Sequence, residues 1–195
     1  MRLYLATAPI PPVSRGQART TASAAAYGLL PMLLEAADLP TDAAYAKTAE
    51  GRPFLPACPQ ADFSISHTDT LALCLLAVDS QRPPRVGIDA EPLLSLSLPK
   101  VQRLAARFLT PGEQAYVNES NDTVKAFLEM FTGKEAFAKY VGTGLAKTLK
   151  IDTVCPHFAK IHHAKLHRLL YREHVVSLCL PEDVPSGALQ ILKHT

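Results

Sequence analysis

The chain alternates between short segments with the spacing of strands and longer segments whose apolar residues recur with the period of a helix. Residues 71–78 form an unbroken apolar run, as in a buried strand, whereas residues 63–67 and 86–91 alternate apolar and polar side chains, as in half-buried strands. Two segments near the C-terminus predict a hairpin. Strands are therefore expected at residues 2–8, 63–67, 71–78, 86–91, 166–171, 174–180 and 188–192.

Helices are predicted at residues 20–37, 99–108, 111–117 and 124–141. Pro31 predicts a kink in the first of them, because proline cannot donate the helical hydrogen bond. The third begins with Thr110-Pro111-Gly112-Glu113, a capping box with proline at the first helical position. The longest helix carries an apolar stripe along one side. Beyond residue 144 the chain is expected to form mainly strands.

These elements fall into two halves of the same order, strand–helix–strand–strand, separated near Pro83-Pro84. No residue-level repeat relates the halves, so the two-fold plan rests on the order of elements alone. That order predicts an α+β (α/β) fold with mainly antiparallel strands. We expect an N-terminal half at residues 1–84 and a C-terminal half at residues 85–195.

Composition narrows the classes of function. The 195 residues carry a net charge of +2, too small for the strongly basic surface of a general nucleic-acid-binding protein. No run approaches the ~20 apolar residues that span a bilayer, so no membrane partner is expected. The four cysteines show no Cys-x-x-Cys spacing, and no secretory signal supports a pair of disulfides. A cytoplasmic protein with reduced thiols is the expectation.

The strand at residues 86–91 presents two carboxylates on one face. Side chains alternate along a strand, so Asp89 and Glu91 lie opposite Ile88 and Ala90. The two backbone positions are ~6.5–7 Å apart, close enough for both carboxylates to bind one hard cation. The alternative is a half-buried strand that turns its charged side chains to water.

The longest predicted helix places Glu135 and Lys139 one turn apart, where their charged groups can meet. Glu135 lies on or beside the apolar stripe, where an acid is costly to bury unless it is paired or bound to a metal. Two other interpretations stay open. One is a plain salt bridge within the helix. The other is a second capping box, Thr132-x-x-Glu135, which would start a helix instead of building a site.

Further polar groups are suited to a phosphate. Ser66, His67 and Thr68 stand where a strand ends, and Arg52 lies in a turn between Gly51 and Pro53. The alternatives are a core histidine at residue 67 and a surface arginine at residue 52. If three acids and one or two ammonium groups converge, they make a site for a divalent ion and a phosphate, which is what phosphoryl-transfer chemistry needs.

Six short motifs follow one another from about residue 19 to residue 150. They are Gly51-Arg52-Pro53, Phe63-Ser64-Ile65-Ser66-His67-Thr68, Val86-Gly87-Ile88-Asp89-Ala90-Glu91, Phe108-Leu109-Thr110-x-x-Glu113, Lys134-Glu135-Ala136-x-x-Lys139 and Gly142-x-Gly144-Leu145. In this order and spacing the chain resembles the Sfp-type 4'-phosphopantetheinyl transferases. Each motif is weak by itself, and the six in register make the resemblance specific.

The resemblance implies a pseudo-dimer of two similar halves, each a mainly antiparallel sheet packed on a long helix, with coenzyme A in the cleft between them. It implies that Asp89, Glu91 and Glu135 hold Mg²⁺ on the pyrophosphate of coenzyme A, and that Lys139 meets the pyrophosphate with Lys134 nearby. The implied contacts to adenine and the 3'-phosphate come from Ser66, His67, Arg52 and the Arg19-Thr20 pair.

Two positions depart from the family pattern. Gly133 replaces a larger residue just before Lys134, which leaves room for a bend in the helix before Glu135. Arg52 stands where lysine is common, and a guanidinium still binds phosphate.

The implied reaction transfers 4'-phosphopantetheine from coenzyme A to a serine of an apo acyl or peptidyl carrier protein and releases 3',5'-ADP. Asp89, Glu135 and Lys139 are the expected catalytic residues, with Glu135 taking the serine proton directly or through a water. A monomer is expected, as for the double-length members of the family.

Carrier proteins are acidic, so Lys100, Arg103 and Arg107 form a candidate docking face, with a solvated charged face as the alternative. Two other functions stay open: a non-catalytic coenzyme A- or nucleotide-binding relative, and a metal-dependent phosphohydrolase. The intact acids and Lys139 argue against the first.

Overall fold

The computed structural model describes residues 1–12, 18–82, 84–94, 96–185 and 187–193, and the side chains of Ala18, Arg19 and Lys193 lie outside the described part. The helices are α1 (Ala18–Gly28), α2 (Leu30–Ala36), α3 (Leu98–Phe108), α4 (Pro111–Glu119), α5 (Thr123–Val141), α6 (Leu145–Thr148) and α7 (Phe158–His162). The strands are β1 (Arg2–Pro9), β2 (Ala46–Lys47), β3 (Pro53–Phe54), β4 (Ala61–His67), β5 (Leu71–Val78), β6 (Gly87–Pro92), β7 (Ala164–Tyr171), β8 (His174–Pro181) and β9 (Leu189–Lys193).

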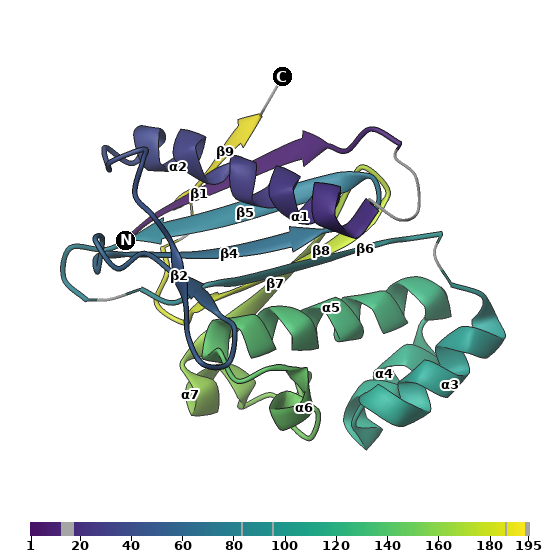
Figure 1. Cartoon of the computed structure of the whole chain (residues 1–195). Coiled ribbons are helices and arrows are strands. Elements are labelled where there is room, and N and C mark those ends of the chain that lie inside the picture. Colours follow the sequence, from purple (N-terminus) through teal and green to yellow (C-terminus); the bar gives the residue numbers. More distant parts are fainter. Residues whose placement is uncertain (13–17, 83, 95, 186, 194–195) are drawn as a thin grey trace.

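Two main sheets form the fold (Figure 1). One is four-stranded with the order β4-β5-β1-β9, and the other is three-stranded with the order β6-β8-β7. Their neighbouring strands are antiparallel except β1 and β9, which run parallel. Helices α1 and α2 pack on the first sheet, and α5 packs on β6 and β8 of the second. The mixed α+β class predicted from the sequence is confirmed.

The sheets pack on each other and are covered by helices on their outer faces. Strand β5 lies between these layers, and all eight of its residues are buried. Leu71, Leu73 and Leu75 contribute to the core between the sheets, whereas Ala72 and Cys74 contribute to the core beneath α1 and α2. A strand covered on both faces needs an unbroken apolar run, which is the pattern that the sequence shows at this position.

Strand β6 differs from β5 because only one of its faces is apolar. Ile88 and Ala90 lie in the core between the sheets, as does Val86, which directly precedes the strand. The opposite face, which carries Gly87, therefore turns toward α5. A Cβ atom on Gly87 would stand 1.9 Å from the carbonyl oxygen of Ala136, so only glycine permits this close packing of strand on helix.

Most predicted elements are confirmed, with shifts of one or two residues at their ends. The helix expected at residues 20–37 is two helices, and Pro31 lies in the first turn of α2, where proline is tolerated. The capping box at Thr110 and Glu113 is present with both of its hydrogen bonds. The four cysteines have free thiols. In the described part of the chain, no helix combines the length and hydrophobicity that crossing a membrane requires.

The division into halves at residues 84 and 85 stays a prediction, and β9 of the second half pairs with β1 of the first. Two other expectations are wrong. Two short helices, α6 and α7, occupy part of the stretch after residue 144 that was expected to form strands. The second capping box does not exist: Asp122 caps α5 by accepting from the backbone N–H of Lys125 at 3.0 Å, and α5 continues through Thr132 and Gly133 without a break.

Candidate active site

Polar side chains of β4 join it to β6, the facing edge of the other sheet. Asp62 Oδ2 accepts from the N–H of Val86 at 2.9 Å, Ser64 Oγ from that of Ile88 at 3.1 Å, and Ser66 Oγ from that of Ala90 at 3.2 Å. The three acceptors on β4 are each two residues apart, and so are the three backbone donors on the facing segment. A single register of the two strands therefore forms all three bonds. We name Asp62, Ser64 and Ser66 the polar seam. It pairs buried backbone donors that a bare sheet edge would leave unsatisfied.

Lys139 of α5 reaches the same junction from the other side. Its ammonium group donates to the carbonyl oxygens of Ile65 at 3.1 Å and Ile88 at 2.8 Å, and to Asp89 Oδ1 at 2.7 Å. An ammonium group has three hydrogens, and each of them has a partner here. The ion pair of Lys139 is thus with Asp89 across the junction, and not with Glu135 one turn away on its own helix.

The predicted acids face one cavity. It has a volume of about 330 Å³, and we name it the acidic cavity. Burial, together with the charges of Asp89 and Glu135, raises the pKa of Glu91 to about 7. Burial and the charge of Asp89 also raise the pKa of Glu135. The lining residues are Ile65, Ser66, His67, Asp89, Glu91, Phe131, Glu135 and Lys139.

This cavity has the chemistry of a cation site. Three carboxylates line it together with the ammonium group of Lys139. Burial is the main cause of the raised pKa of Glu91, and the charges of Asp89 and Glu135 add to it. A hard divalent cation takes oxygen ligands of this kind. Within the described ranges, no three His, Cys, Asp or Glu side chains already stand close enough to hold a metal. The donor set therefore fits a divalent cation in type, and its side chains must converge further to bind one.

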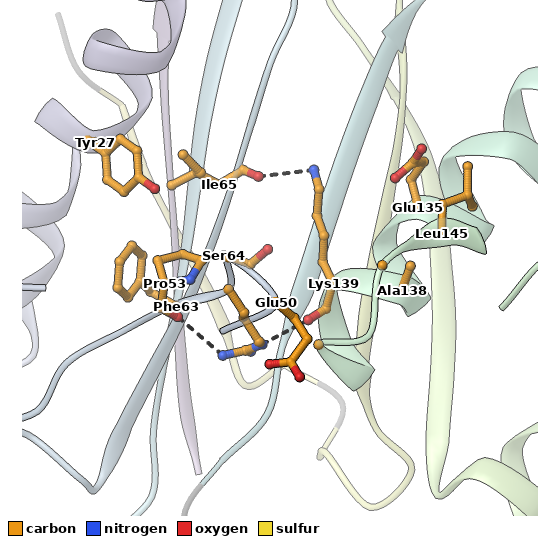
Figure 2. A pocket seen from close by; sticks show the side chains of 14 residues that line it. Tyr27, Glu50, Pro53, Phe63, Ser64, Ile65, Glu135, Ala138, Lys139 and Leu145 are labelled. Atoms are coloured by element: carbon orange, nitrogen blue, oxygen red, sulfur yellow. Dashed lines mark hydrogen bonds between the residues drawn. The ribbon is translucent and has the colours of Figure 1, made fainter. Parts of the chain in front are cut away.

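A second cavity of about 250 Å³ adjoins the first, and Ile65, Glu135 and Lys139 line both. We name it the aromatic cavity. Figure 2 shows Tyr27 and Phe63 on one side of it, with Ala138 and Leu145 on the other. The two cavities together form a site with an apolar end and a charged end, the shape that a ligand with both a flat base and phosphate groups requires.

Tyr27 is a site residue that the sequence pattern did not reveal. Its ring stacks on that of Tyr45 with the ring centroids 4.4 Å apart, and Phe63 meets both rings edge-on. The ammonium group of Lys47 lies 5.9 Å from the centroid of the Tyr27 ring. An aromatic residue in an alanine-rich helix was the one available signal, and it does not distinguish a core residue from a binding residue.

Arg52 lines the aromatic cavity, but its guanidinium group is fully engaged within the chain. Its terminal nitrogens bind the carboxylate of Asp62 at 2.7 and 2.5 Å. The remaining donors reach the carbonyl oxygens of residues 53, 86 and 139. Arg52 thus ties the turn at Gly51, whose φ is +85°, to β4, β6 and α5. The implied contact with a phosphate stays a prediction, and it requires some of these bonds to break.

The structure places Lys134 away from both cavities. Its side chain is 0% exposed and forms a salt bridge with Glu113 at 2.9 Å, while its ammonium group also donates to the carbonyl oxygens of Leu149 and Ile151. Three partners use all three ammonium hydrogens. We therefore leave Lys134 out of the proposed ligands. Consecutive residues of a helix point ~100° apart, so Lys134 and Glu135 extend from α5 in different directions.

The remaining predicted contacts divide as follows. Ser66 and His67 line the acidic cavity. Thr20 is exposed on α1 and lines neither cavity, although Tyr27 of the same helix lines the aromatic one. The side chain of Arg19 lies outside the described residues. The structure thus brings together Arg52, Ser66, His67, Asp89, Glu91, Glu135 and Lys139 around two adjoining cavities.

The fold and the site together define a class of protein. It is a mixed α+β protein in which a cavity of carboxylates and a lysine lies beside an apolar cavity. Such a site suits a phosphorylated ligand and a cation. Residues 85–185 match the family model of the 4'-phosphopantetheinyl transferase superfamily. The chain belongs to this family, which confirms the resemblance found in its motifs.

Individual relatives agree with this assignment. A 4'-phosphopantetheinyl transferase of Bacillus subtilis is 31% identical over 131 residues, which are 66% of this chain and 50% of the relative. The 4'-phosphopantetheinyl transferase HetI of a Nostoc species is 38% identical over 92 residues, 46% of this chain and 36% of HetI. A holo-[acyl-carrier-protein] synthase of Chlamydia pneumoniae is 43% identical over 47 residues, 24% of this chain and 38% of the synthase. The chain spans about half the length of these relatives, or less.

Proposed function

We propose that this protein transfers the 4'-phosphopantetheine group of coenzyme A to a serine hydroxyl of an apo acyl or peptidyl carrier protein. The observation that carries the proposal is the acidic cavity, where Asp89, Glu91, Glu135 and Lys139 converge next to an apolar cavity. Family membership through residues 85–185 supports the same reaction. In the transfer, the serine oxygen bonds to phosphorus, the pyrophosphate P–O bond breaks, and 3',5'-ADP leaves.

Glu135 is the proposed general base for the serine hydroxyl, directly or through a water. Burial and the charge of Asp89 raise the pKa of Glu135, and a carboxylate with a raised pKa accepts a proton more readily. The side chain lines the acidic cavity, where the pyrophosphate is proposed to lie, so it can act on the serine that attacks the pantetheine-bearing phosphorus. The proton leaves the serine oxygen and is held on the carboxylate of Glu135.

Asp89, Glu91 and Glu135 are the residues that would hold Mg²⁺. When bound, the cation would neutralise the charge that develops on the phosphate oxygens. Lys139 already supplies one positive charge at the same place, through its 2.7 Å bond to Asp89. Its ammonium group is positioned to steady the leaving phosphate if one of its carbonyl bonds is exchanged for a phosphate oxygen.

The aromatic cavity is the proposed site for the adenine end of coenzyme A, with Tyr27 and Phe63 as its apolar walls. Ser66 and His67 border the phosphate end. We further propose that the chain acts as a cytoplasmic monomer of two similar halves, with the coenzyme A cleft at the β4–β6 junction. The pairing of β9 with β1 means that such halves share one sheet across the proposed boundary.

Intact-mass spectrometry tests the proposal directly. An apo carrier protein incubated with this protein, coenzyme A and Mg²⁺ should gain one phosphopantetheinyl group, and 3',5'-ADP should appear. Asp89→Ala should abolish the gain, because one of the three acids is removed, while the circular dichroism spectrum stays native. Binding of coenzyme A without transfer to any apo carrier would favour a non-catalytic relative. Breakdown of coenzyme A without a change in carrier mass would favour a hydrolase.

A further inference from the structure

Ser66 makes a hydrogen bond that the other two residues of the polar seam do not make. Its hydroxyl oxygen accepts from the N–H of Ala90, and its hydroxyl hydrogen goes to Asp89 Oδ1 at 3.0 Å. Ser64 also accepts a backbone N–H, from Ile88, and has no such bond to an acid among the described residues. The two serines are almost equally buried, at 5% and 4% exposed. They differ in the contact with Asp89 and in position, since Ser64 lines the aromatic cavity and Ser66 the acidic one.

Ser66 and Lys139 bind the same oxygen of Asp89. Oδ1 accepts from Ser66 at 3.0 Å and from Lys139 at 2.7 Å. Two donors on one oxygen oppose rotation of the carboxylate, because turning it would break both bonds. The donors themselves are fixed: Ser66 by its bond to the β6 backbone, and Lys139 by two carbonyl oxygens. These bonds thus fix the orientation of the Asp89 carboxylate, which lines the acidic cavity.

We infer that Ser66 is a positioning residue that orients the Asp89 carboxylate for a divalent cation. The inference rests on the proposed function, because that function requires the cation, and it gives Ser66 a role different from contact with coenzyme A. A hydroxyl has one hydrogen to donate, and Ser66 donates it to Asp89. The polar seam therefore joins the two sheets and, through Ser66, also fixes the orientation of the Asp89 carboxylate.

Binding of Mn²⁺ to the protein without coenzyme A, followed by electron paramagnetic resonance, tests this role. Loss of a group that orients a metal ligand weakens metal binding about 10- to 100-fold, and we expect Ser66→Ala to lie in this range. Ser64→Ala is the matched control, because it also removes one bond of the polar seam but leaves Asp89 untouched. The two variants should lose similar thermal stability, and Ser64→Ala should keep the Mn²⁺ affinity of the unmodified protein.

Affinity for 3',5'-ADP in the presence of EDTA separates the positioning role from a ligand role. This compound carries the adenine and the 3'-phosphate, which the family resemblance assigns to Ser66. We expect Ser66→Ala to bind it as the unmodified protein does. A loss of 3',5'-ADP affinity with unchanged Mn²⁺ binding would show a ligand role and overturn the inference. If Ser66→Ala does not fold, Ser66→Cys replaces it, because a thiol is only a weak donor.

The outcomes also separate this inference from the proposed function. If Ser66→Ala binds Mn²⁺ as tightly as the unmodified protein does, the positioning role fails and the transfer reaction still stands. An equal loss of Mn²⁺ affinity in Ser64→Ala would likewise refute it, since the effect would then come from the junction as a whole. If the unmodified protein binds no Mn²⁺ at all, the proposed cation site fails, and this inference fails with it.

Discussion

At the scale of single residues, Lys139 explains how three acids are tolerated around one cavity. Its ammonium group lies 2.7 Å from Asp89 Oδ1. Burial and neighbouring carboxylates raise the pKa of Glu91 and Glu135, and the charge of Lys139 opposes this rise. This compensation is incomplete, because one positive charge faces three carboxylates. The cavity is therefore electrostatically strained without a cation, and removing an acid should relieve that strain while it removes activity.

Replacing Glu135 by glutamine tests the general base. The amide cannot accept the serine proton as a carboxylate does, so we expect the turnover number for transfer to fall about 10²- to 10⁴-fold. The thermal midpoint should stay the same or rise, because one of the mutually repelling acids is gone. Intact-mass measurement of the carrier gives the rate, and circular dichroism gives the stability. Full activity in the variant would remove Glu135 from the mechanism.

Glu91 makes the metal-free protein sensitive to pH. Its pKa is raised to about 7 in the folded state, so between its ordinary value and pH 7 the folded chain holds a proton that the unfolded chain has lost. Stability then falls as pH rises through this range, and the loss is complete above about pH 7. In EDTA, Glu91→Gln should therefore raise the melting temperature at pH 8 and change it little at pH 5.

Because Glu91 is partly exposed, water screens its charge, and the effect on stability is smaller than for a fully buried carboxylate. We expect a rise of about 2–4 °C at pH 8, which corresponds to roughly 1 kcal/mol for a chain of this length. Saturating Mg²⁺ should stabilise the unmodified protein at pH 8 and the variant much less. An equal rise in melting temperature at both pH values would show that the carboxylate does not titrate in this range.

At the scale of elements, a buried ion pair holds α5 to the start of α4. Lys134 and Glu113 are both 0% exposed, and the Thr153 backbone N–H and hydroxyl also donate to the Glu113 carboxylate. Removing one partner of a buried pair leaves an uncompensated charge. We therefore expect Lys134→Met to lower the free energy of unfolding by about 3–5 kcal/mol. Urea titration at neutral pH measures this loss.

The double variant Lys134→Met, Glu113→Gln is the control for this experiment. It removes both charges, so part of the lost stability should return. If the single variant were as stable as the unmodified protein but bound coenzyme A poorly, Lys134 would be a ligand after all, and its buried position in the structure would be contradicted.

The elements themselves were largely predictable from the chain, for local reasons. An unbroken apolar run identified β5, alternation identified β4 and β6, and a capping box identified the start of α4. Short helices such as α7 were missed, because five residues carry too little periodicity. The continuity of α5 through Gly133 depends on tertiary packing: a Cβ there would lie 3.3 Å from a guanidinium nitrogen of Arg168, so this side chain covers the glycine.

The site was predictable only in part. Alternation along β6 placed Asp89 and Glu91 on one face correctly, and the helical step placed Glu135 near Lys139. The partner of Lys139 was not predictable, because Asp89 is 50 residues away in the sequence. Nor was the role of Asp62, which was not singled out and which binds Arg52 and the backbone of residue 86. Such contacts form only when the two sheets meet, and no local sequence pattern indicates which residues will then be neighbours.

At the scale of the whole molecule, the candidate docking face lies beside the acidic cavity. Lys100, Arg103 and Arg107 are exposed on α3. The Phe108 ring of the same helix packs on Phe131, which lines the cavity, with 5.7 Å between the ring centroids. A partner that contacts α3 would thus stand close to the acids.

Reversing these three charges to glutamate tests the docking face. An acidic carrier is attracted by basic residues during encounter, so the triple variant should lower kcat/KM for the carrier at least about tenfold, mainly through KM. Affinity for coenzyme A should stay the same, because none of the three residues lines a described cavity. The difference between the variant and the unmodified protein should shrink at high salt. An unchanged KM for the carrier would place the docking face elsewhere.

The two sheets meet along edges that the backbone alone does not pair. Strand β4 ends one sheet and β6 ends the other, and side chains complete the junction between them. A chain that has formed both sheets but not yet brought them together would carry two open strand edges, which are templates for pairing with other molecules. Recovery of native protein after dilution from denaturant should therefore decrease as protein concentration increases, with β-rich aggregates as the competing product.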